Sequence, residues 1–372
     1  MRMEGVVVEV HRERVDRLRG RMRELDVDAL VVAPGSDLRY LSGYDALALE
    51  RPTLLIVRRD GPVAFVAPAL ERMRVEEEVL LPDLELHTYG EGDDALALAG
   101  RTIAVRDGAL VALGDQMWTA FALGLQEVLP GRRWTRASRL VAPIRAVKDP
   151  AELAALAAVG RAIDGVHRRV PDVLRAGRTE REVADELAAM IREEHDHVSF
   201  VIVAAGPNSA SPHHEPGPRI IEHGDAVVVD IGGTLAGYSS DMTRTYAVGR
   251  VPDGFAEAYA ALQEAQAAGV AAVRPGITAG AVDAAARSVL EAAGLGEAFV
   301  HRTGHGIGLD THEEPWIVAG SDVALGEGMA FSVEPGFYLE GRYGARIEDI
   351  VAVTADGVES YNVVDRGLVV VG

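Results

Sequence analysis

Cysteine is absent from the 372 residues of this chain. Disulfide bonds, thiolate zinc sites and cysteine nucleophiles are therefore excluded. A long apolar run is also missing near the N-terminus, where Met1-Arg2-Met3-Glu4 leads into a short valine run before charges resume. A signal peptide or a membrane span needs a longer apolar segment. These absences predict a cytoplasmic protein with no membrane partner.

Positive charge is scarce. The chain has 37 Lys and Arg against 57 Asp and Glu, a formal net charge of −20. Such a surface repels phosphate backbones, so we expect no nucleic-acid partner.

Three motifs of common enzyme classes are missing. Gly304-His305-Gly306-Ile307-Gly308 does not have the G-x-G-x-x-G spacing that binds dinucleotides. His312-Glu313-Glu314-Pro315-Trp316 lacks the second histidine of H-E-x-x-H, and its proline disfavours the helix which that motif needs. No G-x-S-x-G motif occurs. A nicotinamide dehydrogenase, a zincin and a serine hydrolase are therefore disfavoured.

The length and the 48% content of hydrophobic residues indicate a folded protein of two or three domains. Apolar runs and helical periodicity predict a mixed α/β domain over residues 1–143, with strands at 29–33, 53–57, 63–67 and 103–105 and helices at 12–26, 69–80 and 116–129. Residues 144–151 are expected to be a linker. Asp149-Pro150-Ala151-Glu152 then predicts a helix start, because aspartate caps a helix and proline suits its first turn.

Residues 152–372 repeat one order of elements. Helices at 150–169 and 179–195 precede strands at 199–204, 226–231 and 238–248. Helices at 255–273 and 278–293 then precede strands at 298–301, 329–333 and 346–353. Two helices followed by strands, twice over, predict an internally duplicated α+β domain.

Two aspartates, Asp230 and Asp241, lie in strands that should be neighbours in this domain. A carboxylate in a packed strand is costly unless a cation or strong donors satisfy it, and two of them repel each other. Three further residues lie at strand ends or glycine turns: His305, Glu334 and Glu348. Four carboxylates and one imidazole suit a pair of divalent metal ions such as Mn²⁺, Co²⁺ or Zn²⁺, and five ligands are too many for one tetrahedral zinc.

Other polar residues lie close to this set in the sequence. Period-2 alternation predicts that Arg346 and Glu348 share one face of a strand. His213, His301 and His312 are candidates for proton transfer or for stabilising an oxyanion, because the pKa of histidine is near neutral.

The motifs around these residues resemble those of the pita-bread metallopeptidases, which include methionine aminopeptidase, prolidase and aminopeptidase P. The motifs are Pro-His-His with Gly-Asp-Ala-Val-Val-Val-Asp, Ser-Asp-Met-Thr-Arg-Thr, Gly-His-Gly-Ile-Gly with Thr-His-Glu-Glu-Pro, Val-Glu-Pro-Gly and Arg-Ile-Glu-Asp, in the family's order. The first region resembles the N-terminal domain of prolidase, aminopeptidase P and creatinase. The resemblance implies a pita-bread fold for 152–372 after a creatinase-like α/β domain.

The resemblance also implies roles for single residues. Asp230, Asp241, His305, Glu334 and Glu348 match the five metal ligands. In the family, a hydroxide that bridges the two metals attacks the scissile carbonyl, and the residue matching Glu334 handles the proton. His213, rather than His214, and His312 match residues that stabilise the tetrahedral intermediate, whereas His301 and Arg346 match substrate-side positions.

The expected activity is hydrolysis of Xaa-Pro bonds in proline-containing peptides by a homodimer with two divalent metals, Mn²⁺ first. Prolidase, which acts on dipeptides, is favoured over aminopeptidase P, which acts on longer peptides. A creatinase-like hydrolase of a small non-peptide C–N bond and a non-catalytic binding module are the alternatives. Creatinase lacks the metal ligands, and non-catalytic relatives lose them, so the full set of five disfavours both.

Overall fold

The computed structural model of the chain describes residues 2–372 and divides into two compact units. The first unit ends at Arg145, and the second is Ala146–Gly372. The division falls inside the segment 144–151 that the sequence predicts to be a linker. In the part of the chain that the structure describes, no helix is long and apolar enough to cross a bilayer.

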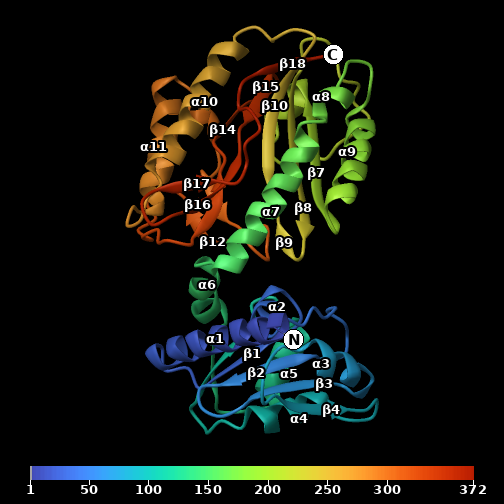
Figure 1. The fold of residues 1–372 in the computed structure, drawn as a ribbon, viewed down its shortest axis with the longest axis vertical. Helices are drawn as coiled ribbons and strands as arrows, with labels where there is room; N and C mark the ends of the chain where they lie inside the picture. The colour runs from blue at the N-terminus through green and yellow to red at the C-terminus, as the bar shows by residue number, and fades with distance from the viewer. Residues whose placement is uncertain (1) are drawn as a thin grey trace. The chain divides into compact units, whose positions relative to one another are not determined.

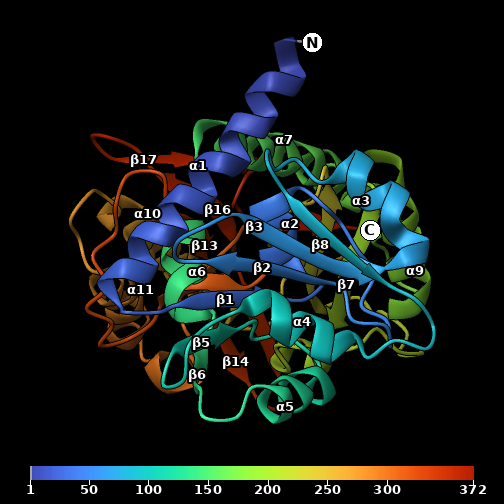
Figure 2. The same ribbon diagram turned by 90° about the horizontal axis from the view of Figure 1, so that it is seen from below.

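The first unit is built on a six-stranded sheet in the order β4-β3-β2-β1-β5-β6. Its strands are β1 (Ala29–Val32), β2 (Leu54–Arg58), β3 (Val63–Pro68), β4 (Glu85–Tyr89), β5 (Leu110–Leu113) and β6 (Arg133–Arg136). Its helices are α1 (Arg2–Glu24), α2 (Ser36–Ser42), η1 (Ala69–Glu71), α3 (Arg72–Glu78), α4 (Ala95–Ile103), α5 (Thr119–Val128) and α6 (Ser138–Ala146). Figure 2 shows α1 along one side of this sheet and α4 with α5 on the other.

One strand predicted in this unit is wrong. Residues 103–105 are not a strand, because Ile103 ends α4 and packs into the core between that helix and the sheet. Ala104 then takes the left-handed conformation that ends the helix. The strand of this region is β5, which starts at Leu110.

The second unit begins with two long helices, a short helix between them and a sheet. The helices are α7 (Pro150–His167), α8 (Val170–Val173) and α9 (Glu180–Glu194), and the strands are β7 (His197–Ala205), β8 (Ala226–Leu235), β9 (Tyr238–Ser239), β10 (Met242–Val248) and β18 (Val369–Val371). The strand order is β18-β10-β8-β7, and β9 pairs with β8. α7 starts where the sequence predicts, since Asp149 and Glu152 form a reciprocal capping box. A single apolar core joins α7 and α9 to this sheet.

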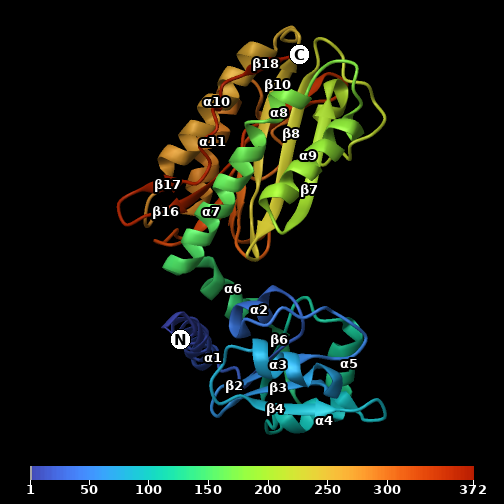
Figure 3. The ribbon, with the colours of Figure 1, turned by 45° about the vertical axis from the view of Figure 1, so that its right-hand side comes forward.

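The rest of the second unit repeats this arrangement. The helices are α10 (Phe255–Ala272) and α11 (Ala279–Ala292), with the short turns η2 (Gly206–Ala210) and η3 (Gly296–Ala298) elsewhere in the unit. The strands are β11 (Gly304–Gly306), β12 (Glu313–Ile317), β13 (Ala330–Val333), β14 (Gly336–Leu339), β15 (Tyr343–Arg346), β16 (Asp349–Val353) and β17 (Val358–Ser360). Five strands form a sheet in the order β12-β11-β13-β16-β17, and β14 pairs with β15. Figures 1 and 3 show α10 and α11 at the left of the unit, α9 at the right and α7 running diagonally between them. Helices followed by strands thus occur twice along the chain, which is the predicted duplication.

Three predicted strands of the second unit differ from the structure. Residues 298–301 do not form a strand, because η3 ends at Ala298 and Phe299 turns into the core with α10 and α11. The run 238–248 is interrupted at Ser240 and Asp241, and the run 346–353 is interrupted at Ile347 and Glu348. Asp241 and Glu348 thus lie in breaks between strands, where a side chain is free from the alternation of the sheet.

Candidate metal centre

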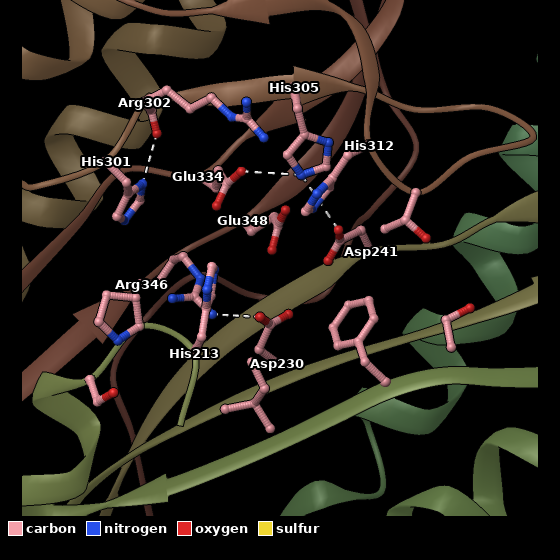
Figure 4. Close-up of a pocket in the computed structure, with 16 residues that line it drawn as sticks. His213, Asp230, Asp241, His301, Arg302, His305, His312, Glu334, Arg346 and Glu348 are labelled. Carbon is pink, nitrogen blue, oxygen red and sulfur yellow. Dashed lines mark hydrogen bonds and ion pairs between the residues drawn. The ribbon is translucent and has the colours of Figure 1, made fainter. Parts of the chain in front are cut away.

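A cavity of about 830 Å³ in the second unit gathers the polar residues that the sequence singles out. All nine predicted site residues line it, together with Arg302 and apolar or hydroxyl-bearing side chains from β7 and the segments around His213 and His312. Figure 4 shows the labelled side chains pointing toward one another across this cavity. The nine are His213, Asp230, Asp241, His301, His305, His312, Glu334, Arg346 and Glu348.

The five predicted metal ligands come from five different places in the second unit. Asp230 lies in β8, and the antiparallel register of β8 with β10 pairs it with Thr243, two residues after Asp241. His305 lies in β11 and Glu334 directly follows β13. Glu348 lies in the break before β16. The two sheets therefore each supply part of one cluster.

The ligand atoms of this cluster converge. Nε2 of His305 lies 3.6 Å from Oδ2 of Asp241 and 3.3 Å from Oε1 of Glu334. Three overlapping groups each have one ligand atom per residue within 4.8 Å of the others. The groups are Asp241 with His305 and His312, His305 with Glu334 and Glu348, and Asp230 with Asp241 and Glu348.

The negative charges of the cluster favour the binding of cations. Within the described residues, Oδ1 of Asp230 and Oε1 of Glu348 are buried without a hydrogen-bond partner. Burial, together with the charges of Asp230 and Glu334, raises the pKa of Asp241 well above its usual value. Burial and the charge of Asp241 do the same to the pKa of Glu348. Unpartnered, mutually repelling carboxylates are unfavourable by themselves, so these residues fit divalent cations.

Neighbouring side chains hold the carboxylates in place. Oγ1 of Thr243 donates a hydrogen bond to Oε2 of Glu348 at 2.7 Å. Oγ of Ser332 donates to Oε1 of Glu334 at 3.1 Å. Such outer hydrogen bonds orient ligand atoms toward a metal.

Tyr338 links Arg346 to His301, and the sequence motifs do not predict its role. Nδ1 of His301 lies 2.7 Å from the carbonyl oxygen of Arg302, so Nδ1 carries the proton and Nε2 accepts one from the Tyr338 hydroxyl at 2.9 Å. NH1 of Arg346 donates to the same hydroxyl oxygen at 2.7 Å, and NH2 donates to Oδ2 of Asp230. Nothing in the sequence distinguishes Tyr338 from a core aromatic on a short strand.

His213 and His214, which are adjacent in the sequence, lie in different environments. His213 lines the cavity, whereas Nε2 of His214 lies 2.8 Å from Oε2 of Glu180. The buried Glu180 carboxylate also accepts from Asn208 Nδ2 at 2.9 Å and from the backbone N–H groups of Ala205 and Gly217, at 2.8 and 3.1 Å. Burial raises the pKa of Glu180, but these hydrogen bonds outweigh it and lower that pKa below its usual value. Glu180 thus fixes both ends of the loop that carries His213. The sequence indicates only that Glu180 lies at the start of a helix.

His312 reaches the cavity from the segment before β12. Its ring lies 4.0 Å from the ring of His305, centroid to centroid. Burial and the charge of Arg302 lower the pKa of His312, so its imidazole is neutral near pH 7 and keeps an N–H to donate. The Glu313 carboxylate, next in the chain, is held by a buried ion pair with Lys148 at 2.7 Å.

Comparisons with known proteins cover nearly the whole chain. The model of metallopeptidase family M24 matches residues 154–355, and the creatinase/prolidase N-terminal domain matches residues 14–147. A probable dipeptidase PepE of Mycobacterium tuberculosis is 47% identical over 98% of this chain and 97% of its own length. An Xaa-Pro dipeptidase of Lactobacillus helveticus is 33% identical over 96% of this chain and 98% of its own.

The fold agrees with a solved relative. The crystal structure of dipeptidase PepE from Mycobacterium ulcerans superposes with a TM-score of 0.93 at 46% identity, covering 98% of each chain. The expected creatinase-like first domain and pita-bread second domain are therefore confirmed. By these matches, the chain belongs to metallopeptidase family M24, with a creatinase/prolidase-type N-terminal domain ahead of its peptidase domain.

Proposed function

We propose that this chain is a two-metal exopeptidase that hydrolyses the Xaa-Pro bond of dipeptides. The observation that carries the proposal is the convergence of five ligand-type side chains with two unpartnered buried carboxylate oxygens. Membership of a metallopeptidase family and the similarity to an Xaa-Pro dipeptidase support it. Asp230, Asp241, His305, Glu334 and Glu348 would hold two divalent ions, Mn²⁺ first and Co²⁺ or Zn²⁺ as alternatives. Such ions supply an activated water and polarise the peptide carbonyl.

The chain's own residues would bind and orient the peptide and move its protons. Glu334 borders the cavity and would handle the proton, as the family resemblance implies. In the metal-free protein, burial and the charge of Asp230 raise the pKa of Glu334 to about 7. His213 and His312 face the cavity and would donate hydrogen bonds to the oxygen on which negative charge develops. His301 would contact the substrate with its ring held by Tyr338. Arg346 would act mainly through Asp230, whose carboxylate it holds.

The first test is hydrolysis of Ala-Pro and Ala-Pro-Ala by the Mn²⁺-loaded protein, beside a sample treated with a chelator. We expect cleavage of Ala-Pro, little cleavage of Ala-Pro-Ala, and loss of activity of about a thousandfold or more on metal removal. Release of alanine together with Pro-Ala from the tripeptide would reassign the enzyme as an aminopeptidase P. No cleavage of either peptide by a protein that binds Mn²⁺ would contradict the proposal and favour a hydrolase of a small non-peptide C–N bond. Failure to bind metal in isothermal titration would indicate a binding module.

A cytoplasmic homodimer is part of the same proposal. It rests on the family resemblance and, for the location, on the absence of cysteine. Light scattering after size-exclusion chromatography measures the dimer directly.

Glu180→Gln should lower kcat by between about ten- and a hundredfold. Glutamine keeps the volume of Glu180 but has no charge and only half of the acceptor capacity of a carboxylate. The hydrogen bonds of residue 180 with His214 and Gly217 are therefore weakened, and the loop no longer fixes the position of His213. Steady-state kinetics on Ala-Pro measure the effect. Glu194→Gln, on the exposed end of the same helix, is the matched control and should not change kcat.

The mechanism of this effect is also testable. Because Glu180 would act through His213, the double variant Glu180→Gln/His213→Ala should be no slower than His213→Ala alone. Losses that multiply instead would show that Glu180 acts by another route.

A further inference from the structure

Lys148 is the only lysine of the chain. The other 36 of the 37 Lys and Arg residues are arginines, so arginine is the ordinary cation of this protein. The side chain of Lys148 is 1% exposed, and its Nζ lies 2.7 Å from Oε1 of Glu313, whose side chain is 9% exposed. An ammonium is a more compact charge than a planar guanidinium. The exception to arginine thus occurs where the cation is enclosed and paired, which indicates a site built for a lysine.

The backbone on both sides of Lys148 is held in place. Its N–H donates to the carbonyl oxygen of Gly328 at 2.9 Å, and Val147 forms a β-bridge with Met329. Asp149, the next residue, caps α7. Figure 1 shows the start of α7 beside β12. Lys148 therefore presents its ammonium to Glu313 from a fixed position.

Glu313 lies at the end of the turn that carries His312. It begins β12, where it pairs with Gly306, the residue after His305. Its carboxylate packs against Gly308 on the other arm of this turn, since a Cβ at Gly308 would lie 2.8 Å from Oε1 of Glu313. Figure 4 shows the ring of His312 beside that of His305, inside the cavity. The carboxylate thus joins the two arms of the turn, and Lys148 fixes the carboxylate.

Stability alone is a weak reason for this ion pair. Removing two charges from water costs about as much free energy as their attraction returns, so hydrophobic residues of similar volume often stabilise a protein equally well. Loss of one partner has a different effect, because the buried charge that remains is unfavourable and turns toward water where the chain allows it. A movement of Glu313 would displace the adjacent His312.

We propose that Lys148 is a positioning residue, which holds the ring of His312 in place through its ion pair with Glu313. The inference rests on the proposed function, in which His312 donates a hydrogen bond to the oxygen that gains negative charge. Lys148 itself lies outside the cavity lining, so it acts on the reaction only through the turn that carries His312. A displacement of about 1 Å at a reacting site lowers a rate by about a hundredfold.

The first experiment measures the kinetics of Lys148→Met on Ala-Pro, with Mn²⁺-loaded protein well below its unfolding temperature. We expect kcat to fall by about 10- to 100-fold and KM to change by less than about threefold. The bound Mn²⁺ per chain should equal that of the wild type, because neither Lys148 nor Glu313 belongs to the converging ligand groups. Lys148→Met/Glu313→Gln leaves no unpaired charge and should be at least about fivefold faster than Lys148→Met.

Two comparisons separate positioning from a general loss of structure. In the His312→Ala background, Lys148→Met should cause no further loss, because its route to the reaction is already removed. Arg169→Met breaks an ion pair of the same 2.7 Å length at an exposed site of the same unit and should keep the wild-type kcat. If Lys148→Met does not fold, Glu313→Gln, which keeps an acceptor for Nζ, takes its place in the comparison with His312→Ala and should lower kcat about three- to tenfold.

Three results would overturn the role of Lys148 and leave the proposed function standing. They are an unchanged kcat in the folded variant, a double variant with Glu313→Gln that is no faster than Lys148→Met, and losses that multiply in the His312→Ala background. Lack of Ala-Pro cleavage by the wild type would overturn the proposed function and this inference with it.

Discussion

Asp241→Ala is expected to lower the turnover of Ala-Pro by at least about a thousandfold, equivalent to about 4 kcal/mol of activation free energy. Asp241 belongs to two of the three groups of converging ligand atoms and is only 4% exposed. Its removal should lower the bound metal by one ion or more per chain, as measured by elemental analysis after gel filtration.

The fold of this variant should persist. In the metal-free protein, Asp241 is buried beside other carboxylates, and the cost of burial and of their repulsion exceeds the stabilisation from its hydrogen bond with Glu348, so its loss should not destabilise the fold. The far-ultraviolet circular dichroism should match that of the wild type, and the metal-free variant should unfold at no lower urea concentration than the metal-free wild type. Asp356→Ala, in an exposed turn of the same unit, is the control and should keep both metal and activity. Full activity of Asp241→Ala would refute the metal-site assignment.

The second large effect is on stability. Arg244→Met should lower the free energy of unfolding by about 3–5 kcal/mol, because it breaks a buried ion pair and leaves one partner behind. NH2 of Arg244 donates to Oδ1 of Asp349 at 2.7 Å, and NH1 donates to the carbonyl oxygen of Glu348 at 2.7 Å. The side chain is 2% exposed and also donates to the carbonyl oxygens of Val364 and Asp365.

Urea unfolding of the metal-free proteins measures this effect, with the midpoint expected to fall at an unchanged slope. Asp349 retains hydrogen bonds from Gln266 and Arg366, which limits the loss to the lower part of the range. Arg274→Met, at an exposed position after α10, should change stability by less than about 0.5 kcal/mol. A similarly small change in Arg244→Met would show that the backbone around Glu348 is held by other contacts.

Local patterns were sufficient to predict the elements on which the site is built. The prediction that two neighbouring strands bring Asp230 and Asp241 together is confirmed in part: β8, which carries Asp230, pairs with β10, but Asp241 lies directly before β10 and not in a strand. The helix start at Asp149 is confirmed for a similarly local reason. The roles of the nine predicted site residues stay a prediction, although all of them line one cavity.

Features that depend on tertiary contacts were beyond the sequence. Tyr338 owes its position to partners from β15 and from the segment before β11, and its short strand resembles any other apolar strand. The strand breaks at Asp241 and Glu348 have no proline or bulge signal, since they arise where two sheets meet at one cluster. The wrong prediction of a strand at 103–105 has a local cause instead. A short apolar run fits the end of an amphipathic helix as well as it fits a strand, and Ile103 ends α4.

The scattering of the five ligand-type residues over two sheets links metal binding to the folding of the whole second unit. Asp230 and Glu348 are far apart in the chain, so an unfolded molecule cannot present them together. An ion that binds only the folded form stabilises it by RT ln(1 + [L]/Kd), which is about 2.7 kcal/mol at a concentration of one hundred times Kd. The melting temperature of this protein should therefore rise with the free concentration of Mn²⁺, and melting temperatures measured in different buffers are comparable only at one fixed concentration of free metal.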